Sequence, residues 1–421
     1  MASRSRFPIG LILSTISFAA FICGCASPPK SIGAGSARPA RLIDQAKTRM
    51  ERELIERIDE IRRQSQIPGL QVIVDHQGEQ HLNLALGLRA VDQPKSFVTS
   101  EDVWHLGSNT KPMTALLIGQ AVERSNLTWH TQIAQALKSH SFPLHQSVKF
   151  ITIDQLLSHQ AGLMEPGSIL GGKLWAAVFR DDQPVGKMRS ALAKGILSTP
   201  TKFAPGTRTE YSNSGYVILG YVAEQTMNSD WESLVRNRIF VPLKMKSCGF
   251  GPAGTKGLEV PDQPWGHRID DTTGSMIAVP PSLQADNPPA FGPAGTVHCS
   301  ASDWVKFLRL FIDGQDERRS RALIVRKETF DHLSNSAQNG FTFSTITKID
   351  RRSWAAGPVY TLAGNNTMNF SQAVIAPKRS LVITVNTNAG HRDAEAGVTK
   401  LLKLITENLP EDSTKLEASI E

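Results

Sequence analysis

Runs of residues with a β-strand pattern occur near both ends of this chain, and a long middle segment separates them. Two runs near the N-terminus flank a polar turn at His76-Gln77-Gly78, and three more follow toward the C-terminus: 70–75, 81–88, 341–345, 370–376 and 381–386. Apolar residues recur at helical spacing in the segments 42–61, 112–123, 132–138, 152–158, 214–226 and 393–408. This order predicts an α+β fold: one antiparallel sheet built from both chain ends and flanked by helices, with an inserted, mostly helical lobe.

The composition is that of an ordinary globular protein. Of the 421 residues, 40% are hydrophobic and 20% charged, which excludes a mainly disordered chain, a collagen and a coiled coil. No apolar run reaches the ~20 residues of a membrane-spanning helix, which excludes a polytopic membrane protein. The formal net charge of +7 is spread along the chain rather than gathered in a basic stripe, so nucleic acid is not expected as a partner.

The first residues are typical of an export signal. Arg4 and Arg6 precede an uncharged stretch at 9–23, a length that suits a secretory signal and is short for a membrane span. The stretch ends in ICGCAS (22–27), which resembles a bacterial lipobox with Cys25 as the lipidated residue; a plain signal peptide cut nearby is the alternative. We therefore predict export to the periplasm or cell surface and anchoring to a membrane through Cys25.

The remaining chain is expected to form one domain between two unstructured segments. After a lipoprotein-type signal segment at 1–24, residues 25–41 are rich in Pro, Ser, Gly and Ala and predict a flexible tether. The segment 42–410 is the expected folded domain, and 411–421 the expected disordered tail.

The cysteines and histidines of this domain give no sign of a metal site. The histidines are scattered, and no Cys/His spacing resembles a set of metal ligands. Four cysteines in the whole chain are too few for a disulfide scaffold. In an exported protein Cys248 and Cys299 could pair, but their separation along the chain says nothing about their distance in space. We expect two separate buried side chains instead.

The segment WHLGSNTK (104–111) is the first candidate for catalytic chemistry. Ser108 and Lys111 lie three residues apart where a helix is expected to begin, since Pro112 is tolerated only in a first turn. At this spacing both side chains share one helix face, and a partly buried lysine with a lowered pKa can take the proton of a nucleophilic serine. The spacing alone is weak, because the tether carries another copy at Ser27-Pro28-Pro29-Lys30.

The second candidate element is Tyr211-Ser212-Asn213, which holds the only Tyr-x-Asn of the chain. A tyrosine can relay a proton between nucleophile and leaving group when a neighbouring ammonium lowers its pKa. The Asn213 amide can hold Lys111 and hydrogen-bond a substrate. The alternative is a structural role, with Ser212 or Asn213 as the N-cap of the helix expected at 214–226.

Several motifs in order resemble the beta-lactamase-related serine hydrolases. This group contains class C beta-lactamases, D-Ala-D-Ala carboxypeptidases, D-aminopeptidases and certain esterases. The resemblance covers about 68–408 and rests on GSNTK (107–111), LLSHQAGL (156–163), YSN (211–213), PLKM (242–245), QPWGH (263–267) and PAGTVHCSASD (293–303). Each piece is weak by itself, and six pieces in order are a strong signal.

The resemblance implies an acyl-enzyme mechanism without a metal or organic cofactor. Ser108 would be the nucleophile, Lys111 its base or base partner, and Tyr211 the general acid/base. The oxyanion would be held by the N–H of Ser108 and an N–H of a strand that lines the site. The substrate would be a small-molecule ester, a peptide or a lactam, and Asn213 would contact it.

The strand motif is where this sequence departs from the family, which usually carries Lys-Thr-Gly or His-x-Gly there. One alignment places Ala363, Gly364 and Asn365 on the motif, and a shift of one residue uses Leu362, Ala363 and Gly364. Neither supplies a Lys or a His to hold a substrate carboxylate. We expect Gly364, Asn365 and Asn366 to contact substrate, with Asn366 as the second oxyanion donor.

The missing cation favours ester cleavage over the other activities of the group. A charge-assisted contact contributes ~1.5–3 kcal/mol, so its loss weakens D-Ala-D-Ala carboxypeptidase or class C-type beta-lactamase chemistry more than esterase chemistry. A binding or scaffold protein that keeps the fold and turns over poorly is the remaining alternative. We expect structural roles for His159, His267, Trp104 and Trp265, and expect Asp303 to cap or begin a helix.

Overall fold

The computed structural model describes residues 49–138, 142–180, 182–314, 324–335, 341–342 and 346–409, which all belong to one compact unit of the chain. The predicted signal segment 1–24, the predicted tether 25–41 with Cys25, residues 42–48 of the expected domain, and the predicted tail 411–421 lie outside the described residues.

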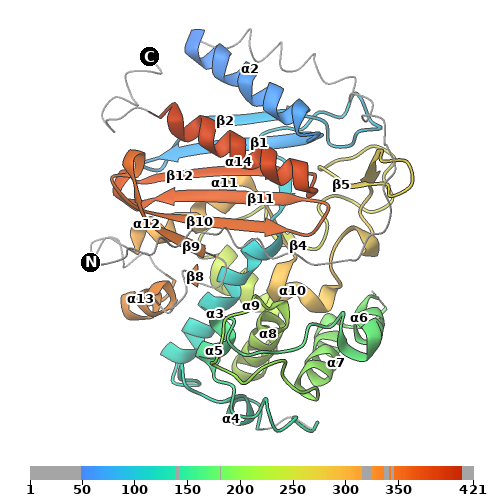
Figure 1. Cartoon of the computed structure of the whole chain (residues 1–421), viewed down its shortest axis with the longest axis vertical. Helices are drawn as coiled ribbons and strands as arrows, with labels where there is room; N and C mark the ends of the chain where they lie inside the picture. The colour runs from blue at the N-terminus through green and yellow to red at the C-terminus, as the bar shows by residue number, and fades with distance from the viewer. Residues whose placement is uncertain are drawn as a thin grey trace, which may run out of the picture. The chain divides into compact units, whose positions relative to one another are not determined.

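The main sheet joins the two ends of the domain, as the sequence predicts (Figure 1). Its seven described strands run in the order β2-β1-β12-β11-β10-β9-β8. Their bounds are β1 Gly69–His76, β2 Glu79–Gly87, β8 Phe341–Thr342, β9 Ile346–Arg352, β10 Gly357–Asn365, β11 Phe370–Ala376 and β12 Leu381–Thr387. β1 pairs antiparallel with β12, with Leu70 opposite Thr387, so the first and last strands lie side by side in the middle of the sheet.

Local sequence explains the first hairpin but gives no clear signal for β9 and β10. Gln77 and Gly78 join β1 to β2 with φ values of 55° and 94°, the left-handed conformation that a tight two-residue turn requires. β10 begins at Gly357-Pro358, and β9 ends in the charged residues Asp350-Arg351-Arg352. Neither strand shows a clean alternation of apolar and polar residues, so periodicity predicted neither, and only the family resemblance indicated a strand within β10.

Helices cover both faces of the sheet. α14 (Arg392–Glu407) packs on β11 and β12, and α2 (Arg49–Gln64) packs on α14. On the other face α11 (Ala301–Leu308) packs on β1 and β12, followed by α12 (Leu310–Asp313). Figure 1 shows α14 in front of the sheet and α11 behind it. The N-cap of α11 is Ser300, and the predicted capping residue Asp303 lies in its first turn instead.

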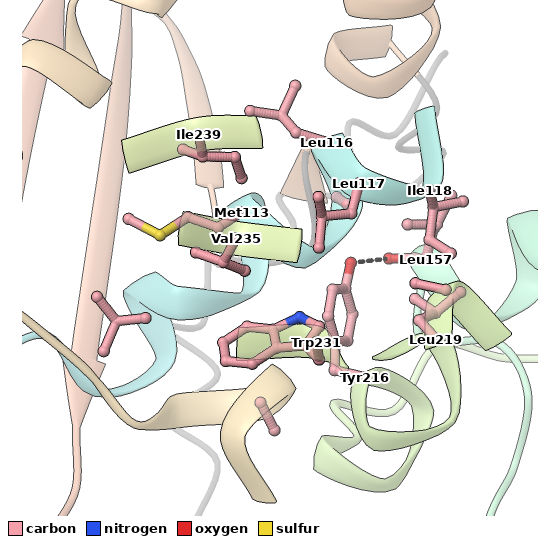
Figure 2. Packing of buried hydrophobic residues seen from close by; sticks show 14 of the residues in the cluster. Met113, Leu116, Leu117, Ile118, Leu157, Tyr216, Leu219, Trp231, Val235 and Ile239 are labelled. Carbon is pink, nitrogen blue, oxygen red and sulfur yellow. Dashed lines mark hydrogen bonds between the residues drawn. The ribbon is translucent and has the colours of Figure 1, made fainter. Parts of the chain in front are cut away.

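The inserted lobe is mostly helical, as predicted, and its core fixes the two helices that carry the candidate site. α3 and α8 pack against one another, and Met113, Leu116, Leu117 and Ile118 of α3 meet Tyr216 and Leu219 of α8 together with Trp231 (Figure 2). The Tyr216 hydroxyl donates to the Leu157 carbonyl at 3.0 Å. The helices of this lobe and its surroundings are α3 Lys111–Glu123, α4 Ile133–Ala136, α5 Ile153–Leu157, α6 Lys173–Val178, α7 Val185–Leu197, α8 Asn213–Met227, α9 Trp231–Val235, α10 Gly292–Gly295 and α13 Lys327–Asn335.

A small three-stranded sheet corrects the expectation for the cysteines. Its order is β3 (Val103–His105), β7 (Val297–Ser300) and β4 (Gly249–Phe250), and a separate hairpin consists of β5 (Gly266–Ile269) and β6 (Met276–Val279). Gly249 lies opposite His298 in the antiparallel pairing of β4 and β7, which makes Cys248 and Cys299 cross-strand neighbours. Their Cα atoms are 4.1 Å apart and the two residues form a disulfide. The prediction of two unpaired thiols was wrong, because strand register rather than sequence separation sets the distance.

Within the described ranges, no helix is both long enough and apolar enough to cross a membrane.

Candidate active site

The candidate nucleophile stands at the junction of the sheet and the helical lobe. Ser108 lies in a 3-10 turn, η1 (Gly107–Thr110), that runs directly into α3, and Pro112 occupies the first turn of α3 as predicted. Ser108 is partly exposed, whereas Lys111, one turn later, is fully buried. The hydroxyl can therefore meet a substrate while the amine is kept from water.

The Lys111 amine is buried and has three close contacts. Nζ lies 2.7 Å from Asn213 Oδ1, 2.6 Å from the Ala294 carbonyl oxygen and 3.1 Å from Ser108 Oγ. The first two oxygens can only accept, so they take two N–H bonds. Burial lowers the pKa of Lys111 from 10.5 to about 7, although the charge of Glu165 opposes this shift. A neutral amine that donates to both acceptors presents its lone pair to the Ser108 hydroxyl.

Tyr211 meets the same oxygen from the other side. Its hydroxyl lies 2.6 Å from Ser108 Oγ, and Lys111 Nζ lies 4.8 Å from the centre of its ring. Desolvation of the phenol, assisted by the charge of Glu165, raises the pKa of Tyr211 even though 40% of the residue is exposed. This direction is opposite to the expected one, because the desolvation of the phenol outweighs the groups that would lower its pKa. Tyr211 is therefore a proton donor to Ser108.

Two groups hold the Tyr211-Ser212-Asn213 segment in place. The Ser212 hydroxyl accepts from the Gly215 N–H at 3.1 Å and is the N-cap of α8, so the structural alternative from the sequence also applies. The Ser212 N–H donates to His159 Nδ1 at 3.0 Å, and the His159 ring packs on Tyr211 with 4.7 Å between ring centres. His159 thus positions the segment, in agreement with the structural role expected for it.

The strand motif lies against the nucleophile through Gly364. A Cβ atom at Gly364 would lie 2.0 Å from the Leu106 carbonyl oxygen and 2.8 Å from Ser108 N, which only glycine avoids. The backbone of Gly107 (φ 52°) approaches the strand equally closely, since a Cβ atom added there would lie 2.5 Å from Asn365 N. This contact makes Gly364 the counterpart of the motif glycine and favours the alignment that begins at Leu362. Leu362 is buried in the core, so no cation enters the site from that position.

The two predicted asparagines after Gly364 do not point to a substrate through their side chains. Asn365 Nδ2 donates to the Gly390 carbonyl at 2.7 Å and to Glu395. Asn366 is buried; its N–H donates to the Asn369 carbonyl at 3.3 Å, and its Nδ2 donates to Asp286 Oδ1 at 3.2 Å. The expectation that Asn366 is the second oxyanion donor is therefore wrong, because its backbone N–H is already bonded within a turn. The backbone of Asn365, next to Gly107, takes its place as the candidate.

Several residues of the site escaped the sequence analysis. Asp286 accepts from His105 Nε2 at 2.8 Å, and His105 Nδ1 accepts from the Gly107 N–H at 3.1 Å, which ties the Ser108 turn to the loop that holds Asn366. Glu165 lies at the start of α8 and acts electrostatically on Lys111. No local pattern marks either carboxylate, because each is defined only by the segments it joins.

Other candidates are structural in the part of the chain that the structure describes. His267 is buried, accepts from the Val91 N–H and contacts the Asn388 carbonyl at 2.7 Å, and burial lowers its pKa to about 4. Trp104 and Trp265 are buried packing groups. Among the described residues, no group of three or more His, Cys, Asp or Glu side chains could hold a metal ion.

The comparisons with known proteins identify the family of the chain. Residues 49–407 match the family model described as Beta-lactamase. The chain belongs to the beta-lactamase family. This family assignment confirms the resemblance seen in the sequence and supports a hydrolase.

A penicillin-binding protein is similar in sequence to this beta-lactamase-family chain, and a penicillin-binding protein homologue and an amidase share its fold. It is 24% identical over 351 residues to "Penicillin-binding protein 4" of Amycolatopsis lactamdurans, covering 80% of this chain and 84% of the relative. It superimposes on the octameric penicillin-binding protein homologue from Pyrococcus abyssi with a TM-score of 0.65 at 21% identity, covering 85% and 78% of the two chains. The D-amino acid amidase from Ochrobactrum anthropi gives a TM-score of 0.64 at 16% identity, with 84% and 99% covered. These structural similarities confirm the predicted fold.

Proposed function

We propose that this protein is an exported serine hydrolase that cleaves an ester or amide through a covalent acyl-enzyme on Ser108. The observation that carries the proposal is the convergence of a hydroxyl, an amine and a phenol: Ser108 Oγ lies 3.1 Å from Lys111 Nζ and 2.6 Å from Tyr211 Oη. A binding protein of the same fold has no need for this arrangement around a partly exposed serine.

In the acylation step, the proton of Ser108 moves to the neutral amine of Lys111 while Oγ attacks the substrate carbonyl carbon. The carbonyl oxygen becomes an oxyanion, and the N–H groups of Ser108 and Asn365, which lie on two closely approaching backbone segments, would stabilise it. Tyr211 gives its proton to the leaving group as the bond to the acyl carbon breaks, and the Lys111 ammonium restores the proton of Tyr211. The net result is an ester on Ser108 and a protonated leaving group.

Deacylation reverses these proton movements with water in place of the leaving group. Tyr211 and Lys111 together accept the proton of the attacking water, and Ser108 leaves with a proton restored to its Oγ. Lys111 remains buried between Asn213 and Ala294 throughout, so its two acceptors fix the direction of its lone pair in both half-reactions.

The test of the acyl-enzyme is covalent labelling with a fluorophosphonate probe. We expect the wild-type protein to be labelled on Ser108, as located by mass spectrometry of the digested adduct, and Ser108→Ala to remain unlabelled. The matched control is Ser275→Ala, which removes an exposed hydroxyl in the turn between β5 and β6 and leaves the nucleophile in place. Equal labelling of wild type and S108A, or no labelling of the wild type by any acyl donor, leaves a binding protein as the function.

We further propose that neutral esters are better substrates than beta-lactams or D-Ala-D-Ala peptides. The two possible alignments place either Leu362, which is buried, or Ala363, which is exposed, at the position of the family's cation. Neither side chain is charged, so a substrate carboxylate gains no charge-assisted contact there. Such a contact contributes ~1.5–3 kcal/mol, or roughly tenfold to a hundredfold in affinity. We expect kcat/KM for a short-chain p-nitrophenyl ester to exceed that for nitrocefin, and comparable values for the two would refute this preference.

Export and anchoring form a separate part of the proposal. The disulfide between Cys248 and Cys299 supports an oxidising compartment, where such bonds persist. We propose that Cys25 carries the lipid of a membrane-anchored protein. Metabolic labelling with a fatty-acid analogue should mark the wild-type protein and not Cys25→Ala, and a soluble, unlabelled wild type contradicts the anchor.

A further inference from the structure

Glu165 lies beside the candidate catalytic groups and contacts the segment that carries two of them. Its Oε1 accepts from the Ser212 hydroxyl at 2.8 Å, and both of its oxygens lie 3.3 Å from the Ser214 N–H. Ser212 stands between Tyr211, which contacts Ser108, and Asn213, which contacts Lys111. One carboxylate is therefore fastened to the residues on both sides of Asn213.

The contacts of Glu165 favour its ionised form. The Ser214 N–H can only donate, and the Ser212 hydroxyl, which accepts from the Gly215 N–H, is left to donate to Glu165. The carboxylate also lies at the N-terminus of α8, a helix of 15 residues whose free N–H groups favour negative charge. Desolvation opposes ionisation and raises the pKa of Glu165.

Two lysines act electrostatically on this carboxylate: Lys111, the first residue of α3, and Lys202, in the loop after α7. Lys202 is paired with Glu210 at 2.6 Å, which neutralises much of its effect. Glu165 is the one charged group that perturbs the pKa of Lys111 among the described residues, and it also acts on the phenol of Tyr211.

We propose that Glu165 is a positioning residue for this reaction, which fixes Tyr211 and Asn213 through Ser212 and Ser214 and sets the proton affinity of Lys111 through its negative charge. The inference rests on the proposed acyl-enzyme function and goes beyond it. Glu165 takes no proton itself; its charge stabilises the ammonium form of Lys111 during acylation, after Lys111 has taken the proton of Ser108 and before it returns a proton to Tyr211.

The test separates the charge of Glu165 from its hydrogen bonds. Glu165→Gln removes the charge, and its amide oxygen can still accept from Ser212 and Ser214. We expect the acid limb of the pH profile of kcat/KM, measured with a neutral p-nitrophenyl ester, to move to lower pH by about half a unit or more, since Lys111 then loses its proton more easily. The rate at the plateau should stay within about threefold of wild type.

Two further variants complete the test. Glu165→Asp keeps the charge on a shorter side chain, so we expect an unchanged midpoint and a plateau about tenfold lower or more as the contacts lengthen. Glu210→Gln is the matched control: the same substitution at a surface carboxylate next to Tyr211 in sequence should move neither quantity. The thermal midpoint of each variant reports whether it is folded.

The outcomes distinguish this inference from the proposed function. If the wild-type protein acylates on Ser108 and E165Q keeps the wild-type midpoint, or E210Q shifts it equally, the role of Glu165 is refuted and the acyl-enzyme stands. If E165Q does not fold, E165D decides: a midpoint displaced from that of wild type refutes the role of the charge. A wild type without an acyl-enzyme refutes both proposals.

Discussion

Replacing Lys111 with methionine should change the pH dependence of stability in a defined way. Methionine is similar in length and cannot titrate, so Lys111→Met removes the amine while filling most of its space. The variant loses the N–H donors for Asn213 Oδ1 and the Ala294 carbonyl, which lowers stability by an amount that does not depend on pH. The pH-dependent part of the difference therefore comes from the titration of one buried amine.

The size of the effect follows from the two pKa values of Lys111. Burial lowers the pKa to about 7 in the folded protein, whereas the unfolded chain keeps a value near 10.5. Between these values the unfolded chain binds a proton that the folded protein does not, so the wild type becomes more stable as pH rises, by about 1.4 kcal/mol per pH unit. Between about pH 7 and about pH 9.5, the free energy of unfolding of the wild type should rise by roughly 3 kcal/mol relative to that of K111M.

The assay is chemical denaturation at a series of pH values. We expect the difference in the free energy of unfolding between wild type and K111M to be flat below about pH 6 and to rise through the alkaline range. Lys149→Met is the control, because the Lys149 side chain is exposed in the folded protein. Its curve should run parallel to that of the wild type. Parallel curves for K111M would show that Lys111 is charged in the folded protein at neutral pH, and would refute its role as a neutral base.

Three further substitutions test other parts of the site and fold. Tyr211→Phe should slow fluorophosphonate labelling by about 10²–10⁴-fold with little change in the thermal midpoint, since it removes a proton donor from a partly exposed side chain; a near-wild-type labelling rate would exclude Tyr211 from the mechanism. Gly364→Ala should lose both labelling and stability, because its Cβ would lie 2.0 Å from the backbone oxygen of Leu106; a folded, fully labelled variant would contradict the close approach. Replacing Cys248 and Cys299 with alanine should lower the free energy of unfolding by about 4 kcal/mol, as measured in denaturant, for a loop of 51 residues; unchanged stability would argue against the disulfide.

The elements with a clear local signal were predictable from the sequence. The helix that begins at Lys111 follows from Pro112 and an apolar run, and β11 and β12 follow from short apolar segments around a Pro-containing turn. The hairpin at Gln77 and Gly78 follows from residues that tolerate positive φ. Local periodicity did not indicate β9 and β10, because these strands are stabilised by pairing with their neighbours and not by their own composition.

The same distinction between local signals and contacts of distant segments applies to the residues of the site. Ser108 and Lys111 are one turn apart, so local helix geometry alone predicts their contact, whereas the approach of Tyr211 depends on the packing of α8 against α3. The sequence could propose this approach only through the order of several motifs. Asn366 was misassigned because a turn that closes through Asn369 uses its amide, and nothing in the sequence separates that amide from its neighbour.

By itself, the sequence determined the secondary structure with strong periodicity, the candidate nucleophile Ser108 with its neighbour Lys111, and the kind of fold. The tertiary structure alone decided that Cys248 pairs with Cys299, that the amine of Lys111 loses its charge near neutral pH, and that Glu165 reaches the start of α8. Backbone hydrogen bonds over a few residues encode the first group. The second depends on desolvation and on contacts between segments far apart in the chain, which exist only once the core has packed.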